Sequence, residues 1–435
     1  MLPLSGVCDG CSPRNHSSQY SGMTMLEMSG LERSTIWKRA LRHGLFAYVL
    51  SRFAVFLGAA IVAAEMKADD NRLKESMIWG LTTRPDPHAR SLSTPRSATS
   101  MILDVLTSWD GIWYMRIVRF GYPGYVPDSI TYDDTQSRVA FFPAFPYAVR
   151  FLDRILPGGD TFAALFLNIA LGVVFILLIG LLTREWFGVE HAQRAMVLTA
   201  IFPGSFVLSF AYSEALLLVL AALCLLFLHR QNWLAAGLTA VLATAARPNG
   251  VAVAVACAVA AFIAVRQTRS LRPLLAPVLA PLGFIAFQYL IDTHTGEQQV
   301  WFRVQTEAWD EGASFGFTAI RRTLEAFTQP LTSPTDLITA ASFVATIFLL
   351  YLAWRYHHLP LPAAAYSAVI IALMLLPATV TARPRFLFTA FPLLVSCAVW
   401  LDHPRRREWW PYLVGLCFAG LTALTGVYGV YGAIP

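Results

Sequence analysis

The chain has 435 residues, of which 56% are hydrophobic and only 14% are charged, and its mean hydropathy is +0.54. Soluble globular chains carry about a quarter charged residues, so this composition excludes an ordinary soluble domain and predicts a multi-pass membrane protein. The formal net charge of +6 does not indicate a nucleic-acid partner, because the cytoplasmic loops of membrane proteins collect Lys and Arg.

The first 30 residues are polar and rich in Ser. We expect them to form a disordered leader before a single membrane-embedded domain at residues 31–435. Cys8 and Cys11 have CxxC spacing, but no second pair or His cluster in the sequence completes a metal site. The other four cysteines lie within apolar runs and are expected to pack in the core: Cys224, Cys257, Cys397 and Cys417.

Eleven apolar runs approach the length of about 20 residues that a transmembrane helix needs. Together they predict an all-α fold, a polytopic bundle of about 11 transmembrane helices. The runs are Leu45 to Ala64, Thr161 to Leu182, Ala195 to Ala211, Ala215 to Leu228, Trp233 to Ala246, Val251 to Val265, Leu274 to Ile291, Leu337 to Trp354, Leu361 to Val380, Phe386 to Leu401 and Tyr412 to Tyr431.

The basic segment from Arg33 to His43 precedes the first run and predicts a cytoplasmic N-terminus. Alternation then places two long loops outside the membrane, at about 65–160 and 292–336, and we expect the first to carry short amphipathic helices. The fifth and sixth runs are short, and the segment 247–250 separates them. A single long helix broken at this segment is an alternative, and it would invert the sidedness of everything downstream.

Polar side chains gather on the predicted outer side. A charge at membrane depth is costly, so it usually marks a functional group or a buried ion pair. Because the clusters come from distant parts of the sequence, their common side predicts one shared site. They are Asp110, Tyr212-Ser213-Glu214, Arg247-Pro248-Asn249-Gly250, Gln305 with Trp309, and Arg383-Pro384-Arg385.

Four of these clusters have structural alternatives. Asp110 fits the N-cap of a helix that begins at the next residue, since Asp is favoured there. Glu214 and Arg247 fit a buried ion pair inside the bundle. Arg383 and Arg385 fit interfacial anchors, although positive charge on the outer side runs against the usual bias. Their functional alternative is a guanidinium clamp on a phosphate or pyrophosphate.

The same segments resemble the PIG-V family of mannosyltransferases, within the GT-C class of integral membrane glycosyltransferases, and the chain looks like a bacterial-type member. The matching segments run in order between about residues 45 and 400. They are Ser51-Arg52, Trp109-Asp110-Gly111-Ile112-Trp113-Tyr114, Gly121-Tyr122, Ala140-Phe141-Phe142-Pro143-Ala144-Phe145-Pro146, Tyr212-Ser213-Glu214-Ala215-Leu216, Arg247-Pro248-Asn249-Gly250, Arg385-Phe386-Leu387 and Phe391-Pro392.

The resemblance implies transfer of a mannosyl residue from a polyprenyl-phosphate-linked donor to a lipid or glycan acceptor, on the outer face of the cell membrane and with inversion. Carried over, Asp110 is the general base that takes the proton from the acceptor hydroxyl. Such donors generally need no nucleotide, and the sequence has no P-loop and no motif with metal-ligand spacing. We therefore expect no cofactor and no metal, with the lipid-linked sugar and membrane lipids as partners.

The remaining site residues are assigned from their chemistry. Positive charge stabilises a phosphate leaving group, which favours Arg383 and Arg385, with Arg247 next. The expected substrate contacts are the aromatic side chains, which suit sugar faces, and two polar side chains: Trp109, Trp113, Tyr114 and Trp309, with Glu214 and Gln305. A groove for the isoprenoid tail is expected along Phe141, Phe142, Pro143 and Phe145.

Two other functions stay open. A transporter or flippase of lipid-linked sugars should spread polar residues through the membrane depth or contain inverted repeats, and the sequence indicates neither. A GT-C transferase of another sugar, such as arabinose, would use the same lipid carrier.

Overall fold

The computed structural model describes residues 30–78, 97–310, 312–329, 333–356 and 359–430. Within these ranges the chain is α-helical with short 3-10 segments, and its one β-type contact is an isolated bridge between Ala313 and Pro377. The predicted all-α class is confirmed. The leader up to residue 29, with Cys8 and Cys11, lies outside the described residues.

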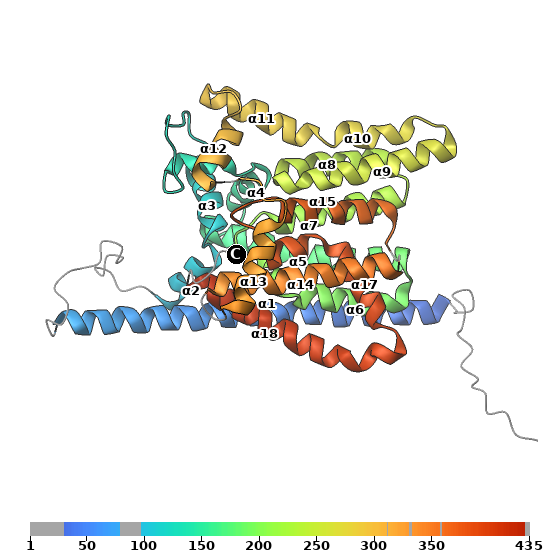
Figure 1. Cartoon of the computed structure of the whole chain (residues 1–435), viewed down its shortest axis with the longest axis horizontal. Helices are drawn as coiled ribbons and strands as arrows, with labels where there is room; N and C mark the ends of the chain where they lie inside the picture. The colour runs from blue at the N-terminus through green and yellow to red at the C-terminus, as the bar shows by residue number, and fades with distance from the viewer. Residues whose placement is uncertain (1–29, 79–96, 311, 330–332, 357–358, 431–435) are drawn as a thin grey trace, which may run out of the picture.

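The bundle helices lie side by side and run between two ends of the molecule (Figure 1). Among the described residues, six helices are long and apolar enough to cross a membrane by length and composition, and four are shorter but apolar. The helices of the bundle are α1 (Gly30–Ile78), α5 (Gly159–Trp186), α6 (Ala192–Ile201), α7 (Glu214–His229), α8 (Trp233–Ala246), α9 (Val251–Thr268), α10 (Leu275–Leu279), α11 (Leu282–Thr295), α14 (Pro334–Tyr356), α15 (Leu361–Leu375), α16 (Pro384–Thr389), α17 (Phe391–Leu401) and α18 (Trp410–Gly429).

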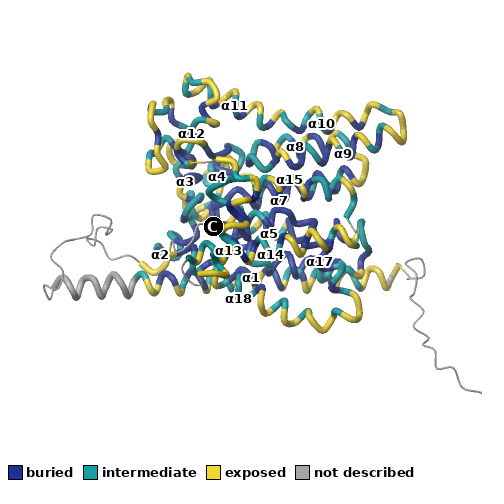
Figure 2. The backbone as a smooth tube through the Cα atoms, viewed as in Figure 1, coloured by how far each residue is buried: buried dark blue, intermediate teal, exposed yellow. Residues whose placement is uncertain are grey.

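The two long connections contain helices of their own. The first holds α2 (Ala98–Leu106), α3 (Asp110–Phe120), the 3-10 segment η1 (Thr135–Ala140) and α4 (Ala144–Asp153), as predicted. The second holds α12 (Val300–Trp309) and α13 (Phe317–Thr328), where the sequence predicted only a loop. Buried residues gather along α7 in the middle of the bundle (Figure 2). Exposed large apolar residues include Ile285 and Tyr289 of α11 and Tyr412 and Leu416 of α18.

The predicted span 195–211 is not one helix. α6 ends at Ile201 and the 3-10 segment η3 (Pro203–Leu208) follows, because Pro203 has no N–H for a continuing helix. Arg52 of α1 is buried beside η3 and donates to the Ser205 carbonyl at 2.8 Å and to the Ser205 and Ser209 hydroxyls, each at 2.9 Å. This buried guanidinium therefore satisfies polar groups that the break exposes inside the bundle.

Two further spans contain breaks next to prolines. Ala390 separates α16 from α17, and Pro392 follows at the start of α17. Pro281 precedes α11 and separates it from α10. By contrast, α8 and α9 are separate helices that pack against each other, with Arg247 at their junction. The alternative of one long broken helix is wrong.

The two ends of the bundle differ in their side chains. α3 and α7 begin at one end, which we call the site end. At the opposite end, Arg230 pairs with Glu185, and His191 Nδ1 lies 2.8 Å from an Asp402 carboxylate oxygen. The start of α8 and the start of α10 also line one hollow there. The loops predicted to share the inner side therefore do lie at one end.

Gly204 supplies a test of how tightly the broken segment packs. A Cβ at Gly204 would lie 2.1 Å from the backbone carbonyl oxygen of Pro384, whereas a Cβ at exposed Gly415 would meet nothing within 4 Å. We expect Gly204→Ala to destabilise the protein by about 1–3 kcal/mol or more. Gly415→Ala should be neutral or slightly stabilising, since Ala favours helix. Thermal unfolding of the purified variants measures both, and equal melting temperatures would contradict the packing described.

Candidate active site

Two carboxylates and two guanidinium groups meet at the site end. Arg385 Nη1 lies 2.6 Å from Asp110 Oδ2 and 3.5 Å from Glu214 Oε1. Arg247 Nη1 lies 2.7 Å from Glu214 Oε2, and its Nη2 lies 3.9 Å from Asp110 Oδ2. We call these four side chains the charge cluster. Four segments that are far apart in the sequence therefore converge, and the Glu214–Arg247 ion pair is present within a larger group.

Burial distinguishes the members of the charge cluster. The Glu214 side chain is fully buried, those of Arg385 and Arg247 are 7% and 10% exposed, and that of Asp110 is 20% exposed. Buried charges are costly unless they are paired, and each carboxylate here has two guanidinium neighbours. Asp110 is the member that a substrate can reach most easily.

The backbone at Trp109 sets the direction of Asp110. α3 begins at Asp110, and its N-cap is Trp109, which makes no side-chain capping hydrogen bond. The φ of 56° and ψ of −122° at Trp109 are rare for a bulky residue and cost of order 1–3 kcal/mol. The indole N–H of Trp109 donates to the Tyr428 carbonyl at 3.0 Å. The proposed N-cap role of Asp110 is therefore wrong, and its carboxylate faces Arg385 instead.

Tyr114 supports the charge cluster from α3. Its hydroxyl lies 2.5 Å from the hydroxyl of Ser213, which also accepts from Arg247 Nη1 at 3.1 Å. Burial raises the pKa of Tyr114 to about 12, so the phenol keeps its proton at neutral pH. Tyr114 thus holds the Ser213 hydroxyl in place with an uncharged phenol, and Ser213 in turn accepts from Arg247.

Aromatic rings continue the site from α3 to α12. Ring centroids are 5.7 Å apart for Trp113 and Trp309, 5.6 Å for Phe141 and Trp309, and 5.0 Å for Tyr114 and Phe141. Trp113 is buried and Trp309 is half-buried. Gln305 donates to the carbonyl of Ala140 at 3.4 Å and so supports this aromatic wall.

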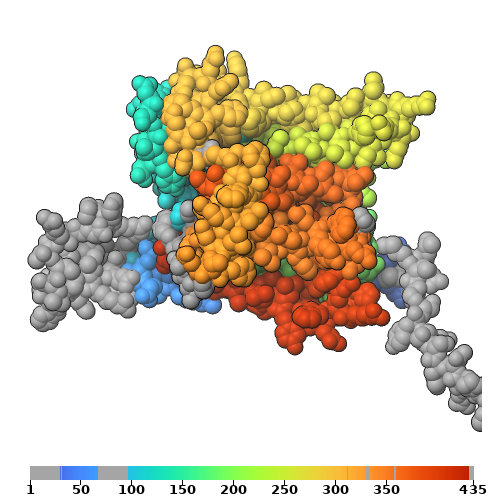
Figure 3. Space-filling view, viewed as in Figure 1, coloured from blue at the N-terminus to red at the C-terminus, as the bar shows by residue number. Residues whose placement is uncertain are grey.

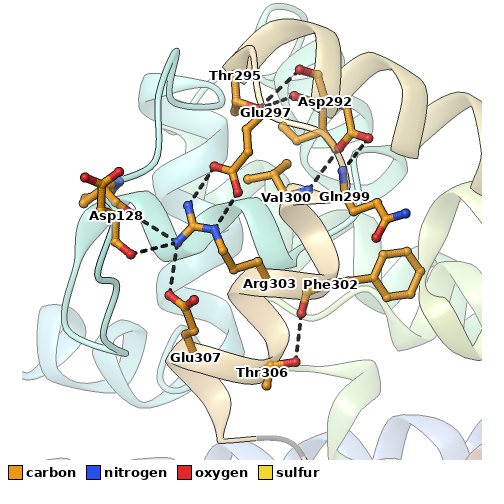
Figure 4. A network of polar contacts seen from close by, with 12 residues as sticks. Asp128, Asp292, Thr295, Glu297, Gln299, Val300, Phe302, Arg303, Thr306 and Glu307 are labelled. Carbon is orange, nitrogen blue, oxygen red and sulfur yellow. Dashed lines mark hydrogen bonds and ion pairs between the residues drawn. The ribbon is translucent and has the colours of Figure 1, made fainter.

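A polar network fixes α12 beside the first long connection (Figure 4). Arg303 Nε lies 2.5 Å from Glu297 Oε1, and Arg303 Nη1 lies 3.0 Å from Glu307 Oε2. Nη1 also donates to the carbonyl of Pro127 at 3.1 Å. The hydrogen bond from Arg303 holds the pKa of Glu297 below its usual value. Because α12 carries Trp309, this network sets the position of the aromatic wall.

The prediction that Phe141, Phe142 and Phe145 line a groove for the isoprenoid tail is wrong, because these side chains are buried. Phe142 and Phe145 are 1% and 0% exposed, and Phe141 is also buried. Phe142 packs on Phe287 with centroids 4.3 Å apart, and Phe145 packs on Tyr114 at 5.3 Å. Pro143, which is half-buried, precedes α4. This apolar run forms the core beneath α3 and α11 and leaves no phenylalanine surface for a lipid tail.

Arg383 and Arg385 are not interfacial anchors, because both are buried. Arg383 lies outside the charge cluster and donates to the Thr335 carbonyl at 3.3 Å and to the Thr339 hydroxyl of α14. Its Nε and Nη2 have no hydrogen-bond partner within the described ranges. An unsatisfied buried donor costs about 1–3 kcal/mol or more, so Arg383 is poised to bind an acceptor.

Arg322 is a residue that the sequence reasoning missed. It lies on α13, and its Nε is 3.8 Å from an Asp336 carboxylate oxygen. The signal was present in the helical spacing, because Arg322 falls opposite Phe317, Ile320 and Leu324 on the same helix.

No group of three or more His, Cys, Asp or Glu side chains is placed to hold a metal in the part of the chain that the structure describes.

Comparisons with family models and with curated proteins find no match. Among solved structures, the chain is similar to ArnT from Cupriavidus metallidurans bound to undecaprenyl phosphate, with 16% identity, a TM-score of 0.46, and coverage of 74% of this chain and 63% of that chain. It is also similar to the Archaeoglobus fulgidus oligosaccharyltransferase in complex with Zn and sulfate, with 16% identity, a TM-score of 0.42, and coverage of 76% and 53%. The chain spans less than two thirds of either protein, and the PIG-V resemblance stays a prediction.

Removing one charge from the cluster tests its role in stability. Glu214→Gln leaves two buried guanidinium groups with only the carboxylate of Asp110, and we expect a loss of about 3–5 kcal/mol in the free energy of unfolding. The control is Asp160→Asn, which breaks the 2.5 Å pair with Arg119, whose side chain is 49% exposed. That change should cost about 1 kcal/mol or less. Denaturant unfolding in detergent measures the free energy of unfolding of both variants. If Glu214→Gln loses no more than Asp160→Asn, the charge cluster does not stabilise the fold in this way.

Proposed function

We propose that the protein is a GT-C-type membrane glycosyltransferase that transfers a mannosyl residue from a polyprenyl-phosphate donor to a lipid or glycan acceptor. The observation that carries the proposal is the position of Asp110. It is the most exposed member of a buried charge cluster, with an aromatic wall and a further buried arginine close by. The sequence resemblance to the PIG-V family supports the choice of sugar and donor.

In this reaction Asp110 acts as the general base. Both Arg385 and Arg247 approach its Oδ2, which leaves Oδ1 to accept the hydrogen of the acceptor hydroxyl. As that oxygen attacks the anomeric carbon, its proton passes to Asp110. The bond between the anomeric carbon and the phosphate oxygen breaks, and the lipid phosphate leaves with the electron pair. One displacement of this kind inverts the anomeric configuration.

The surrounding side chains divide into two groups. Arg385, Arg247 and Arg383 supply positive charge near the phosphate that leaves, which stabilises the transition state. Trp309 is half-buried and suits a sugar face better than Trp113, which is covered by its neighbours. Trp109, Tyr114, Glu214 and Gln305 act behind these groups as supports, because their polar atoms face protein partners.

The arrangement favours an enzyme over a transporter. The charge cluster lies where α3 and α7 begin, so its four charged side chains are gathered at one end of the bundle and are not spread along it. In the proposed orientation the N-terminus is cytoplasmic and the site end faces outward, where lipid-linked sugars are used. A GT-C transferase of another sugar, such as arabinose, remains the second candidate for the donor.

The proposal is tested with membranes or purified protein supplied with radiolabelled polyprenyl-phosphomannose. We expect Asp110→Asn to lower the rate of mannosyl transfer by about 100-fold or more, since general-base catalysis contributes 10²–10⁴ in rate. The matched control is Asp133→Asn, an exposed carboxylate of the same connection, which should keep the wild-type rate.

Equal rates for wild type and Asp110→Asn would remove Asp110 from the mechanism. Absence of mannosyl transfer with wild type, but transfer from another polyprenyl-phosphate sugar, would correct the sugar and keep the reaction class. Movement of the intact donor across vesicles without any transfer would replace the enzyme with a transporter.

A further inference from the structure

We propose that Arg322 of α13 and Arg383 together bind the lipid phosphate of the donor, and that the donor arrives from the bilayer alongside α13. This inference rests on the proposed function and adds a residue and a route to it. It extends the phosphate site from Arg383 to Arg322, next to the Asp110–Arg385 pair.

The balance of charge is the first argument. The charge cluster contains two arginines and two carboxylates and is neutral. Arg383 and Arg322 meet at the start of α14, because Arg383 donates to the Thr335 carbonyl at 3.3 Å and Arg322 Nε lies 3.8 Å from the carboxylate of the next residue, Asp336. Four guanidinium groups against three carboxylates leave one positive charge unbalanced. A buried site with such an excess favours a ligand that carries one negative charge.

The unused hydrogen-bond donors are the second argument. Nε and Nη2 of Arg383 and Nη1 of Arg322 are buried and have no hydrogen-bond partner among the described residues. The Arg383 side chain is fully buried, so its charge is not stabilised by solvent. Guanidinium forks suit phosphate oxygens in both geometry and charge. A single phosphate group therefore satisfies the donors and the excess charge together.

The orientation of α13 is the third argument. Phe317, Ile320, Leu324 and Phe327 lie on one face of this helix and are 47% to 74% exposed. The opposite face carries buried Thr318 and Ala319 together with Arg322. An apolar face turned outward is typical of a helix that lies at a membrane interface. Figure 3 shows α13 (orange) at the surface of the molecule, and α13 packs against α14.

The charge balance, the unused donors and the orientation of α13 together fit the binding of a lipid with an anionic head. The apolar tail stays against bilayer lipid and the outward face of α13, while the phosphate reaches Arg322 and Arg383 on the inward side. Arg383 and Arg385 flank Pro384 at the start of α16. A sugar attached to this phosphate is therefore directed toward Arg385 and its partner Asp110.

Arg322 and its neighbour Arg321 provide a matched pair of variants. Arg321 is exposed, with its Nε 3.7 Å from Glu325 on the same helix. The experiment measures binding of a sugar-free polyprenyl phosphate to the full chain in phosphatidylcholine nanodiscs. We expect Arg322→Gln to raise the dissociation constant about tenfold or more, as for a lost hydrogen bond to a charged group. Arg321→Gln should change it by less than about twofold, as expected for a weak exposed pair.

Two competition measurements identify the ligand. Inorganic phosphate and phosphatidylglycerol are added as competitors, and neither should displace the polyprenyl phosphate when present in modest excess. Equal competition by phosphatidylglycerol would make this a site for ordinary anionic phospholipid, and equal competition by inorganic phosphate would remove the lipid tail from recognition. Either result overturns the assignment.

Thermal unfolding shows whether the Arg322→Gln variant folds. If it does not fold, crosslinking of the wild-type chain tests the inference. A polyprenyl phosphate with a photoreactive group next to its phosphate should crosslink to peptides of α13 or α14. Crosslinks confined to other helices overturn the inference.

The two proposals fail separately. Binding that depends on Arg322, without any sugar transfer, would overturn the transferase and keep the phosphate site. Normal transfer by a folded Arg322→Gln variant with an unchanged donor KM would overturn this inference and keep the transferase. The expected kinetic result is a donor KM raised about tenfold with kcat within about threefold, because Arg322 acts in binding.

Discussion

The ion pairs among Asp110, Glu214, Arg247 and Arg385 are the constraint on which the site end depends. None of these charges is stable alone in the interior of a bundle, because the cost of removing a charge from water is recovered only by close partners. The four come from separate segments, between residues 110 and 385, so the pairing fixes where α3, α7, α8 and α16 meet. The fold and the candidate active site are therefore stabilised by the same contacts.

Irregular backbone is the second requirement, and it follows from the first. A continuous apolar helix has no free polar backbone groups and cannot turn two arginines inward within three residues. The chain breaks at Pro203 and again before Pro392, and η3 packs directly on α16 with Gly204 against the Pro384 carbonyl. Arg52 then satisfies the carbonyl and hydroxyl groups that the first break leaves open. Breaks of this kind occur at membrane depth only where protein groups bond the freed backbone.

The sequence predicted which segments meet, because charges in apolar chains are few and costly enough to mark a common site. It did not predict the partners, since pairing depends on side-chain positions within a few ångströms. Hydropathy located the runs around α6 and α17 but not their breaks, because prolines among apolar residues barely change the average. It also misassigned Phe142 and Phe145, since apolar residues look alike whether they face lipid or core. Arg322 was missed because α13 lies in a connection and has its apolar face outward.

Charge balance links the parts of the proposed reaction. A polyprenyl-phosphate sugar is a phosphodiester with one negative charge, which balances four arginines against the carboxylates Asp110, Glu214 and Asp336. When the sugar leaves, the phosphate becomes a monoester with close to two negative charges. At the same step Asp110 gains the proton of the acceptor hydroxyl and loses its own charge. The site is therefore close to neutral before and after transfer, and no uncompensated charge is created in a medium where such a charge is costly. A base and a phosphate site that share one group of arginines achieve this balance, and separate neutral sites would not.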